Sequence, residues 1–151
     1  MKRKILTILL AMSFILTAAY AEEAQEALLD KAIRVAEDGE SLIRMSEDDL
    51  YDIIGIEPGE YTDFAYLADH DSLTGREIIV LRATDEKAAE SMAEKLEEYR
   101  QYRLHMTRNY PDQADAYRLL SKAEVLHEDL MVVLTIAPPD PQEAGLLLQE
   151  E

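Results

Sequence analysis

One long helical segment separates two pairs of strand-like segments, and this arrangement constrains the fold more than any other feature of the chain. Strand patterns occupy residues 60–69 and 77–83 before the helix, and residues 123–127 and 130–136 after it. Side chains at helical spacing mark the segment 86–108: Ala89, Met92, Leu96, Tyr99, Arg103 and Met106. Two hairpins around a helical block predict an α+β fold, with a mainly antiparallel four-stranded sheet and the long and shorter helices on one of its faces.

The strand patterns also predict which side chains share a face. Residues 77–83 are apolar on both faces, which favours an interior strand. In residues 60–69 we expect two sets on opposite faces: Thr62, Phe64, Tyr66 and Ala68 against Tyr61, Asp63, Ala65 and Leu67. Residues Glu128 and Asp129 are expected to form the turn of the last hairpin, in which Leu130, Val132, Leu134 and Ile136 share a face.

Capping residues predict where several helices begin and end. Ser46 precedes three acidic residues and predicts the start of a short helix that turns Leu50, Ile53 and Ile54 inward and ends at Gly55. Thr84 and Asp85 offer a cap for the long helix, and Pro111 favours the first turn of another helix behind it. Residues 22–37 carry an imperfect apolar stripe and predict an N-terminal helix.

The first 21 residues have the three parts of a secretory signal peptide. Lys2, Arg3 and Lys4 precede an uncharged apolar run from Ile5 to about Ala18, and Ala19-Tyr20-Ala21 has the small-residue pattern of a cleavage site. The apolar run is shorter than the ~20 residues that span a bilayer. We therefore expect a secreted or extracytoplasmic protein cleaved near Ala21, with an uncleaved membrane anchor as the alternative.

The charge of the chain narrows the classes of partner. The chain holds 15 basic and 32 acidic residues; loss of the three basic residues at the N-terminus leaves 12 against 32, a net charge of −20. Binding to nucleic acid requires Lys and Arg to neutralise phosphates, so a nucleic-acid partner is not expected. A membrane contact is expected only through an uncleaved signal peptide.

The chain contains no cysteine, so a packed core has to stabilise it without disulfides. We expect four parts: a signal peptide (1–21), an N-terminal helix or linker (22–40), an α+β domain (41–137), and a proline-rich break with a short C-terminal helix (138–151). The last part carries Asp140, Pro141 and Glu143 at the spacing of a helix start.

Four short patterns give the chain a family resemblance: Leu50 to Ile56, Glu77 to Val80 leading to Asp85, Asn109-Tyr110-Pro111, and Ala123-Glu124-Val125. Together they resemble a bacterial family catalogued as domain of unknown function 4358, over roughly residues 42–137. The resemblance implies a small exported or lipoprotein domain and carries no functional residues. This chain lacks the lipoprotein cysteine and has Glu128-Asp129 where a turn with glycine is common.

Motifs for catalysis and metal binding are not found. His70, His105 and His127 have no second ligand at helical spacing, and Asp69-His70-Asp71 does not continue as a calcium loop. No serine lies in a nucleophile motif. Glu77 is the carboxylate that opens the buried strand, and we expect it to reach solvent at the strand end. The sequence therefore predicts no catalytic residue, no metal site and no cofactor.

Tyrosines and arginines gather in one stretch of this acidic chain. The stretch runs from 99 to 118, and these residue types are enriched in binding hot spots. The candidate partner-binding residues are Tyr99, Arg100, Tyr102, Arg103 and Tyr110. Arg103 interrupts an apolar stripe, so it should find a carboxylate partner if it is buried. The alternative is structural, with long side chains that cover a helix flank.

These observations lead to one preferred hypothesis and two alternatives. The preferred hypothesis is a non-catalytic exported acidic domain that binds a protein or a component of the cell surface. One alternative is an envelope-directed hydrolase that uses paired carboxylates, and the other is an anchored structural domain. The sequence identifies neither the partner nor the oligomeric state.

Overall fold

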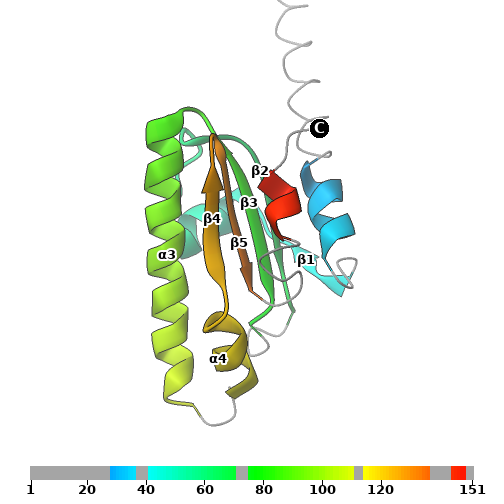
Figure 1. Cartoon of the computed structure of the whole chain (residues 1–151), viewed down its shortest axis with the longest axis vertical. Helices are drawn as coiled ribbons and strands as arrows, with labels where there is room; N and C mark the ends of the chain where they lie inside the picture. Colours follow the sequence, from blue (N-terminus) through cyan, green and yellow to red (C-terminus); the bar gives the residue numbers. More distant parts are fainter. Residues whose placement is uncertain (1–27, 37–40, 71–74, 111–113, 137–143, 149–151) are drawn as a thin grey trace, which may run out of the picture.

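The computed structural model describes residues 28–36, 41–70, 75–110, 114–136 and 144–148 (Figure 1). The signal peptide predicted at residues 1–21 and the helix start predicted at 140–143 lie outside the described residues. Residues 28–35 are helical, in agreement with the predicted N-terminal helix. The other elements, in chain order, are β1 (Ile43–Arg44), α2 (Glu47–Asp49), the π-helical turn η2 (Leu50–Ile54), β2 (Tyr61–Ala68), β3 (Glu77–Ala83), α3 (Glu86–Arg108), α4 (Ala114–Leu120), β4 (Glu124–Glu128), β5 (Met131–Ile136) and the 3₁₀ turn η4 (Gly145–Leu148).

The fold is α+β, and its sheet is antiparallel throughout the described strands, in the order β1-β2-β3-β5-β4. The prediction of four strands is wrong by one, because β1 adds a two-residue strand at the edge beside β2. Two residues are too short for an alternating pattern to be recognised. The interior position predicted for residues 77–83 is confirmed, since β3 lies between β2 and β5.

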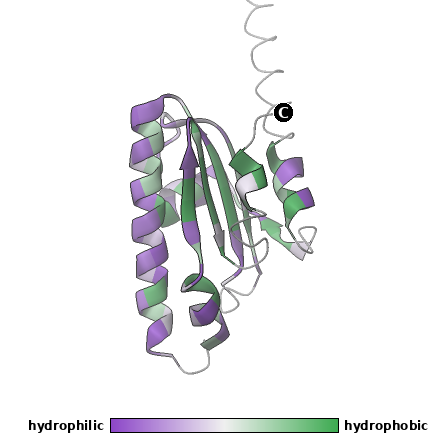
Figure 2. Cartoon of the chain, in the orientation of Figure 1, coloured by the Kyte–Doolittle hydropathy of each residue, from purple (hydrophilic) through white to green (hydrophobic). Residues whose placement is uncertain are grey.

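Helices cover both faces of the sheet, which corrects the prediction that they gather on one face (Figure 1). The first face packs against α3, α4 and η2 through residues such as Met92, Leu96 and Leu120. The second face packs against the helix of residues 28–35 and against η4. The reason lies in the strands themselves. Hydrophobic residues predominate along β2, β3 and β5 (Figure 2), and nearly all residues of these strands are buried, so each side of the sheet needs cover.

The predicted helix starts are confirmed at two positions. Ser46 caps α2 and forms a reciprocal capping box with Asp49. Asp85 caps α3, where its side chain accepts a hydrogen bond from the backbone amide of Ala88 at 2.8 Å. Gly55 ends η2 with φ of 80°, in the left-handed region that glycine adopts easily.

Two side chains point in directions that differ from those predicted from the sequence pattern. A β-bulge between Tyr61 and Asp63 shifts the alternation, so Tyr61 lies on the face of Phe64 instead of the opposite face. Ile53 is 45% exposed rather than turned inward. It belongs to the π-helical turn η2, whose wider turn changes the angle between successive side chains.

The long helix α3 has the predicted bounds, but its apolar stripe is not buried along its whole length. Met106 near its end is 42% exposed. At 1.5 Å per residue α3 is about 34 Å long, whereas an eight-residue strand such as β2 is about 27 Å long. The last turns of α3 therefore extend beyond the sheet.

The last hairpin has the predicted strands with a turn shifted by one residue. Glu128 pairs with Met131, so Asp129 and Leu130 form the turn instead of Glu128 and Asp129. Asp129 takes the positive φ of 49°, which Asp tolerates better than most residues. The shared face of Val132, Leu134 and Ile136 is confirmed. Within the described residues, no helix is long and apolar enough to cross a membrane.

Candidate functional site

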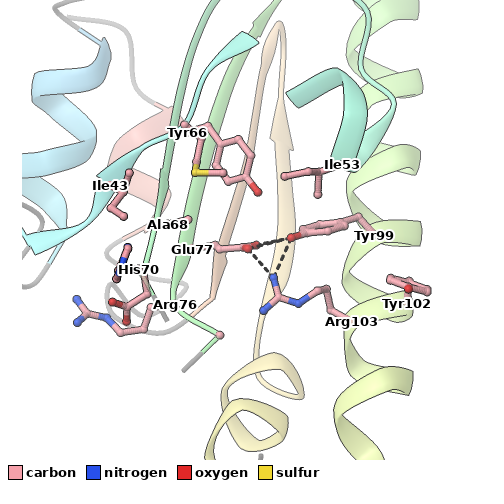
Figure 3. Close-up of a pocket in the computed structure, with 13 residues that line it drawn as sticks. Ile43, Ile53, Tyr66, Ala68, His70, Arg76, Glu77, Tyr99, Tyr102 and Arg103 are labelled. Carbon is pink, nitrogen blue, oxygen red and sulfur yellow. Dashed lines mark hydrogen bonds and ion pairs between the residues drawn. The ribbon is translucent and has the colours of Figure 1, made fainter. Parts of the chain in front are cut away.

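A pocket of about 460 Å³ opens between α3, η2 and the β1–β2 edge of the sheet (Figure 3). This volume lies within the range of roughly 300–1,000 Å³ that is typical of ligand pockets. Much of its wall is apolar and comes from four elements and one loop residue: Ile43 (β1), Met45, Ile53 (η2), Tyr66 and Ala68 (β2), and Tyr102 (α3). The wall is thus assembled from segments far apart in the sequence.

One wall of the pocket carries a buried polar cluster of Glu77, Tyr99 and Arg103 (Figure 3). The Tyr99 hydroxyl lies 2.9 Å from both carboxylate oxygens of Glu77. Arg103 Nη1 donates to Glu77 Oε1 at 2.5 Å and to the Tyr99 hydroxyl at 2.8 Å. The Arg103 guanidinium also lies 5.7 Å from the centre of the Tyr99 ring, within the range of a cation–π contact.

The fold brings these three residues together by two simple spacings. Tyr99 and Arg103 are four residues apart on α3, so they lie on the same face of the helix. Glu77 is the first residue of β3 and pairs with Ala68 on one side and Ile136 on the other. The helix and the strand end meet at the pocket, and the expectation that Arg103 finds a carboxylate is confirmed.

Burial determines the electrostatics of the cluster. Glu77 is only 7% exposed, which corrects the expectation that it reaches solvent at the strand end. Burial raises the pKa of Glu77, and the charge of Arg103 and the hydrogen bond from Tyr99 offset part of that effect. Burial and the nearby Glu77 raise the pKa of Tyr99 to about 12, and burial is also the main cause that raises the pKa of Tyr66. Both phenols therefore stay protonated near neutral pH.

Charged residues and a glycine with a positive φ line another part of the pocket. Asp69, His70 and Arg76 lie in the connection between β2 and β3. Gly75 has φ of 74°, and a Cβ atom there would lie 3.2 Å from the Cβ of Ala116 in α4. Glycine therefore allows this connection to pass close to α4.

The sequence of the chain matches a model of a known protein family. A family model described as Domain of unknown function (DUF4358) matches residues 34–137, more than half of the chain. The chain belongs to the DUF4358 family. The match spans β1 through β5 and includes every residue of the pocket named above. No curated protein and no solved structure matches the chain.

In this DUF4358 chain, three of the five predicted partner-binding residues meet at the pocket: Tyr99, Tyr102 and Arg103. Tyr102 is 61% exposed, whereas Tyr99 is buried at 8%. The other two lie elsewhere. Arg100 pairs with Glu97 and donates to the carbonyl of Leu120, and Tyr110 is half-exposed just beyond the end of α3.

The sequence patterns did not identify the pocket residues that lie on the strands and on η2 of this DUF4358 chain. Ile43, Tyr66 and Ile53 line it, although no pattern singled them out as site residues. The contact between Arg103 and Glu77 could have been found from the sequence. Arg103 interrupts an apolar stripe and needs a carboxylate partner if it is buried, and Glu77 is the carboxylate that begins the buried strand. Among the described residues, no group of three or more His, Asp or Glu side chains is placed to hold a metal ion.

Proposed function

We propose that this DUF4358 chain is an exported, non-catalytic binding domain that holds a protein or a cell-surface component in the pocket between α3 and the β1–β2 edge. The observation that carries the proposal is the pocket itself, which joins apolar walls to a buried polar cluster. Ligand sites in proteins have this composition, with mainly apolar linings and a few placed polar groups.

The residues beside the pocket support a binding role. Tyr102, Ile53 and Ile43 line the pocket and are 61%, 45% and 41% exposed. Three large apolar or aromatic side chains that stay accessible beside one concavity provide area that a partner can bury. The export part of the proposal depends on the signal-peptide pattern of residues 1–21.

The state of Glu77 favours binding over catalysis. Arg103 donates to Glu77 Oε1, and the single hydroxyl proton of Tyr99 is shared between Oε1 and Oε2. Both oxygens of this carboxylate are already engaged by protein donors, which suits a fixed hydrogen-bond acceptor in a binding site better than a general base that has to take a proton from a substrate.

A hydrolase is the second candidate, and one observation favours it. Asp69 and Glu77 line the same pocket, as paired carboxylates of a hydrolase would. Under that proposal Glu77→Gln abolishes an activity on envelope material, whereas under the binding proposal no such activity is present in the wild-type protein.

Affinity capture with two matched variants tests the binding proposal. Ile53→Asp places a charge in the pocket wall, and Leu146→Asp places the same charge on η4, on the opposite face of the sheet. The two positions are 45% and 50% exposed, so both variants should fold. We expect a partner captured from the producing cells by the wild type and by Leu146→Asp to be lost with Ile53→Asp. Equal capture by all three proteins, or none, would contradict the proposal.

A further inference from the structure

We infer that the pocket receives one neutral aromatic side chain with a hydrogen-bond donor at its tip, of the tyrosine or tryptophan type, from an extended peptide segment flanked by basic residues. This inference rests on the proposed binding function and specifies its ligand. It follows from three features of the described residues, namely an acceptor, a charge balance and a sheet edge, and from the net charge of the full sequence.

The first feature is an acceptor on the pocket wall. A carboxylate offers about four lone-pair positions. Glu77 Oε1 accepts from Arg103, and the one Tyr99 hydroxyl proton is shared between Oε1 and Oε2, so among the described residues Oε2 has no other donor. Glu77 lines the pocket, so an N–H or O–H group of a ligand can add a hydrogen bond at Oε2. A ligand with a donor at its tip therefore fits better than a purely apolar one.

The second feature is the balance of charge around the pocket. Two acidic residues, Asp69 and Glu77, and two arginines, Arg76 and Arg103, line it. A charged ligand group would bring an additional desolvated charge beside the Glu77–Arg103 pair, which is unfavourable without a partner of its own. The buried part of the ligand is therefore neutral, and aromatic groups such as phenol and indole combine an apolar body with a donor tip.

The third feature is the strongly acidic character of the chain as a whole. The formal net charge is −17 at pH 7. Parts of a ligand that remain outside the pocket lie in this negative field, which attracts cations and accelerates their association. Lysine or arginine beside the aromatic residue is therefore favoured, and acidic flanks are disfavoured.

The fourth feature identifies the ligand backbone as that of a peptide. Among the described strands, β1 is at the edge of the sheet and pairs with β2 on one side. Ile43 of β1 and Met45, which directly follows it, line the pocket. An extended peptide that pairs with a sheet edge gains main-chain hydrogen bonds while alternate side chains enter adjacent pockets. The edge at β1 and the pocket are adjacent, as that mode of recognition requires.

Four blocked pentapeptides test the inference: Lys-Lys-Tyr-Lys-Lys, Lys-Lys-Phe-Lys-Lys, Lys-Lys-Leu-Lys-Lys and Glu-Glu-Tyr-Glu-Glu. Binding to the purified protein is followed by ¹H–¹⁵N NMR. We expect the first peptide to shift signals of residues 43–45, 53 and 99–103. We expect the phenylalanine peptide to bind on the order of tenfold more weakly, because it lacks one hydrogen bond to a charged group. We expect the acidic peptide not to bind.

Two variants connect the result to the pocket. Glu77→Gln should bring the tyrosine and phenylalanine peptides closer in affinity, and Ile53→Asp should abolish binding of all peptides that bind the wild type. Equal binding of the tyrosine, phenylalanine and acidic peptides would overturn the inference. So would binding that Ile53→Asp leaves unchanged.

Free phenol and toluene distinguish failure of this inference from failure of the proposed function. Shifts of the pocket signals with phenol, without binding of any peptide, would overturn the peptide inference and leave the pocket as a ligand site. Absence of shifts with peptides and with both small probes would count against the inference and the proposed function together.

Discussion

The guanidinium of Arg103 lies against the carboxylate of Glu77, and their side chains are only 16% and 9% exposed. A buried ion pair contributes little net stability as a pair, because desolvation offsets most of the attraction. Removal of one partner is different, since it leaves the other charge buried without compensation. This relationship gives the first prediction.

Arg103→Met should destabilise the protein by about 3–5 kcal/mol near neutral pH. The reason is that, among the described residues, Tyr99 is then the one hydrogen-bond partner left to the buried Glu77 carboxylate. The double variant Glu77→Gln/Arg103→Met should recover a large part of this loss, because it removes both charges. Urea unfolding of the single and double variants measures both effects. A double variant that is as unstable as Arg103→Met would contradict this account of the pair.

The second prediction concerns the dependence of stability on pH. The pKa of Glu77 is raised in the folded protein, mainly by burial, above its ordinary value of 4.5. The folded state therefore holds this proton more tightly than the unfolded chain, and the corresponding stability is complete below about pH 4.5 and is lost as the pH rises through the raised pKa. The free energy of unfolding of the wild type should decrease relative to Glu77→Gln across that interval.

Chemical denaturation at closely spaced pH values, with both proteins in the same buffers, measures this difference. The comparison with Glu77→Gln is needed because hydrogen bonds lower the pKa of Asp49 and Glu97, and their effect on stability has the opposite sign. If the difference in the free energy of unfolding between the two proteins does not change with pH, the pKa of Glu77 in the folded protein is not raised.

The third prediction concerns Asp63 on the second face of the sheet. This residue is 5% exposed, and its Oδ1 has no hydrogen-bond partner in the described part of the chain. Burial raises its pKa, and the charge of Arg82 opposes part of that effect. Ionised Asp63 therefore destabilises the fold above the ordinary pKa of 3.8, increasingly as the pH passes the raised value.

Asp63→Asn should increase the free energy of unfolding at pH 7.5 by about 1 kcal/mol. At pH 3.5, where the carboxyl is protonated, the same substitution should have little effect. Urea unfolding at the two pH values provides the test. If Asp63→Asn destabilises the protein equally at both pH values, the Asp63 carboxylate has a favourable partner.

The fourth prediction concerns the glycine beside the pocket. Gly75→Ala combines a positive φ of 74° with a contact of 3.2 Å to the Ala116 Cβ, so it should destabilise by about 1 kcal/mol or more. Gly59→Ala is the control, because a Cβ at Gly59 meets no atom within 4 Å and its φ is not positive. Thermal unfolding should separate the two variants clearly. Equal melting temperatures would show that the β2–β3 connection adapts without strain.

Much of the fold could be predicted because the segments that form it are long and periodic. The bounds of α3, the two hairpins and the interior position of β3 all follow from local patterns. The errors occur where a local pattern is interrupted or too short. The bulge at Tyr61 and the π-helical turn at Ile53 each change the direction of a side chain, and β1 has only two residues.

The candidate site was predictable only in the part that one helix supplies. Tyr99, Tyr102 and Arg103 share a side of α3 because of their spacing, and the need of Arg103 for a carboxylate follows from its place in an apolar stripe. Tyr66 and Ile43 reach the same pocket through strand pairing. That pairing depends on contacts between segments distant in sequence, which composition and periodicity do not specify.

The central claim is that a partner occupies the pocket beside Glu77 and Arg103, and photo-crosslinking in intact cultures of the producing cells tests it most directly. A photoreactive phenylalanine derivative replaces Tyr102 in the pocket wall or Leu146 on the opposite face of the sheet, both of which are exposed. The account predicts a discrete crosslinked species from position 102 and none from position 146. Crosslinks from both positions alike, or from position 146 alone, would contradict it.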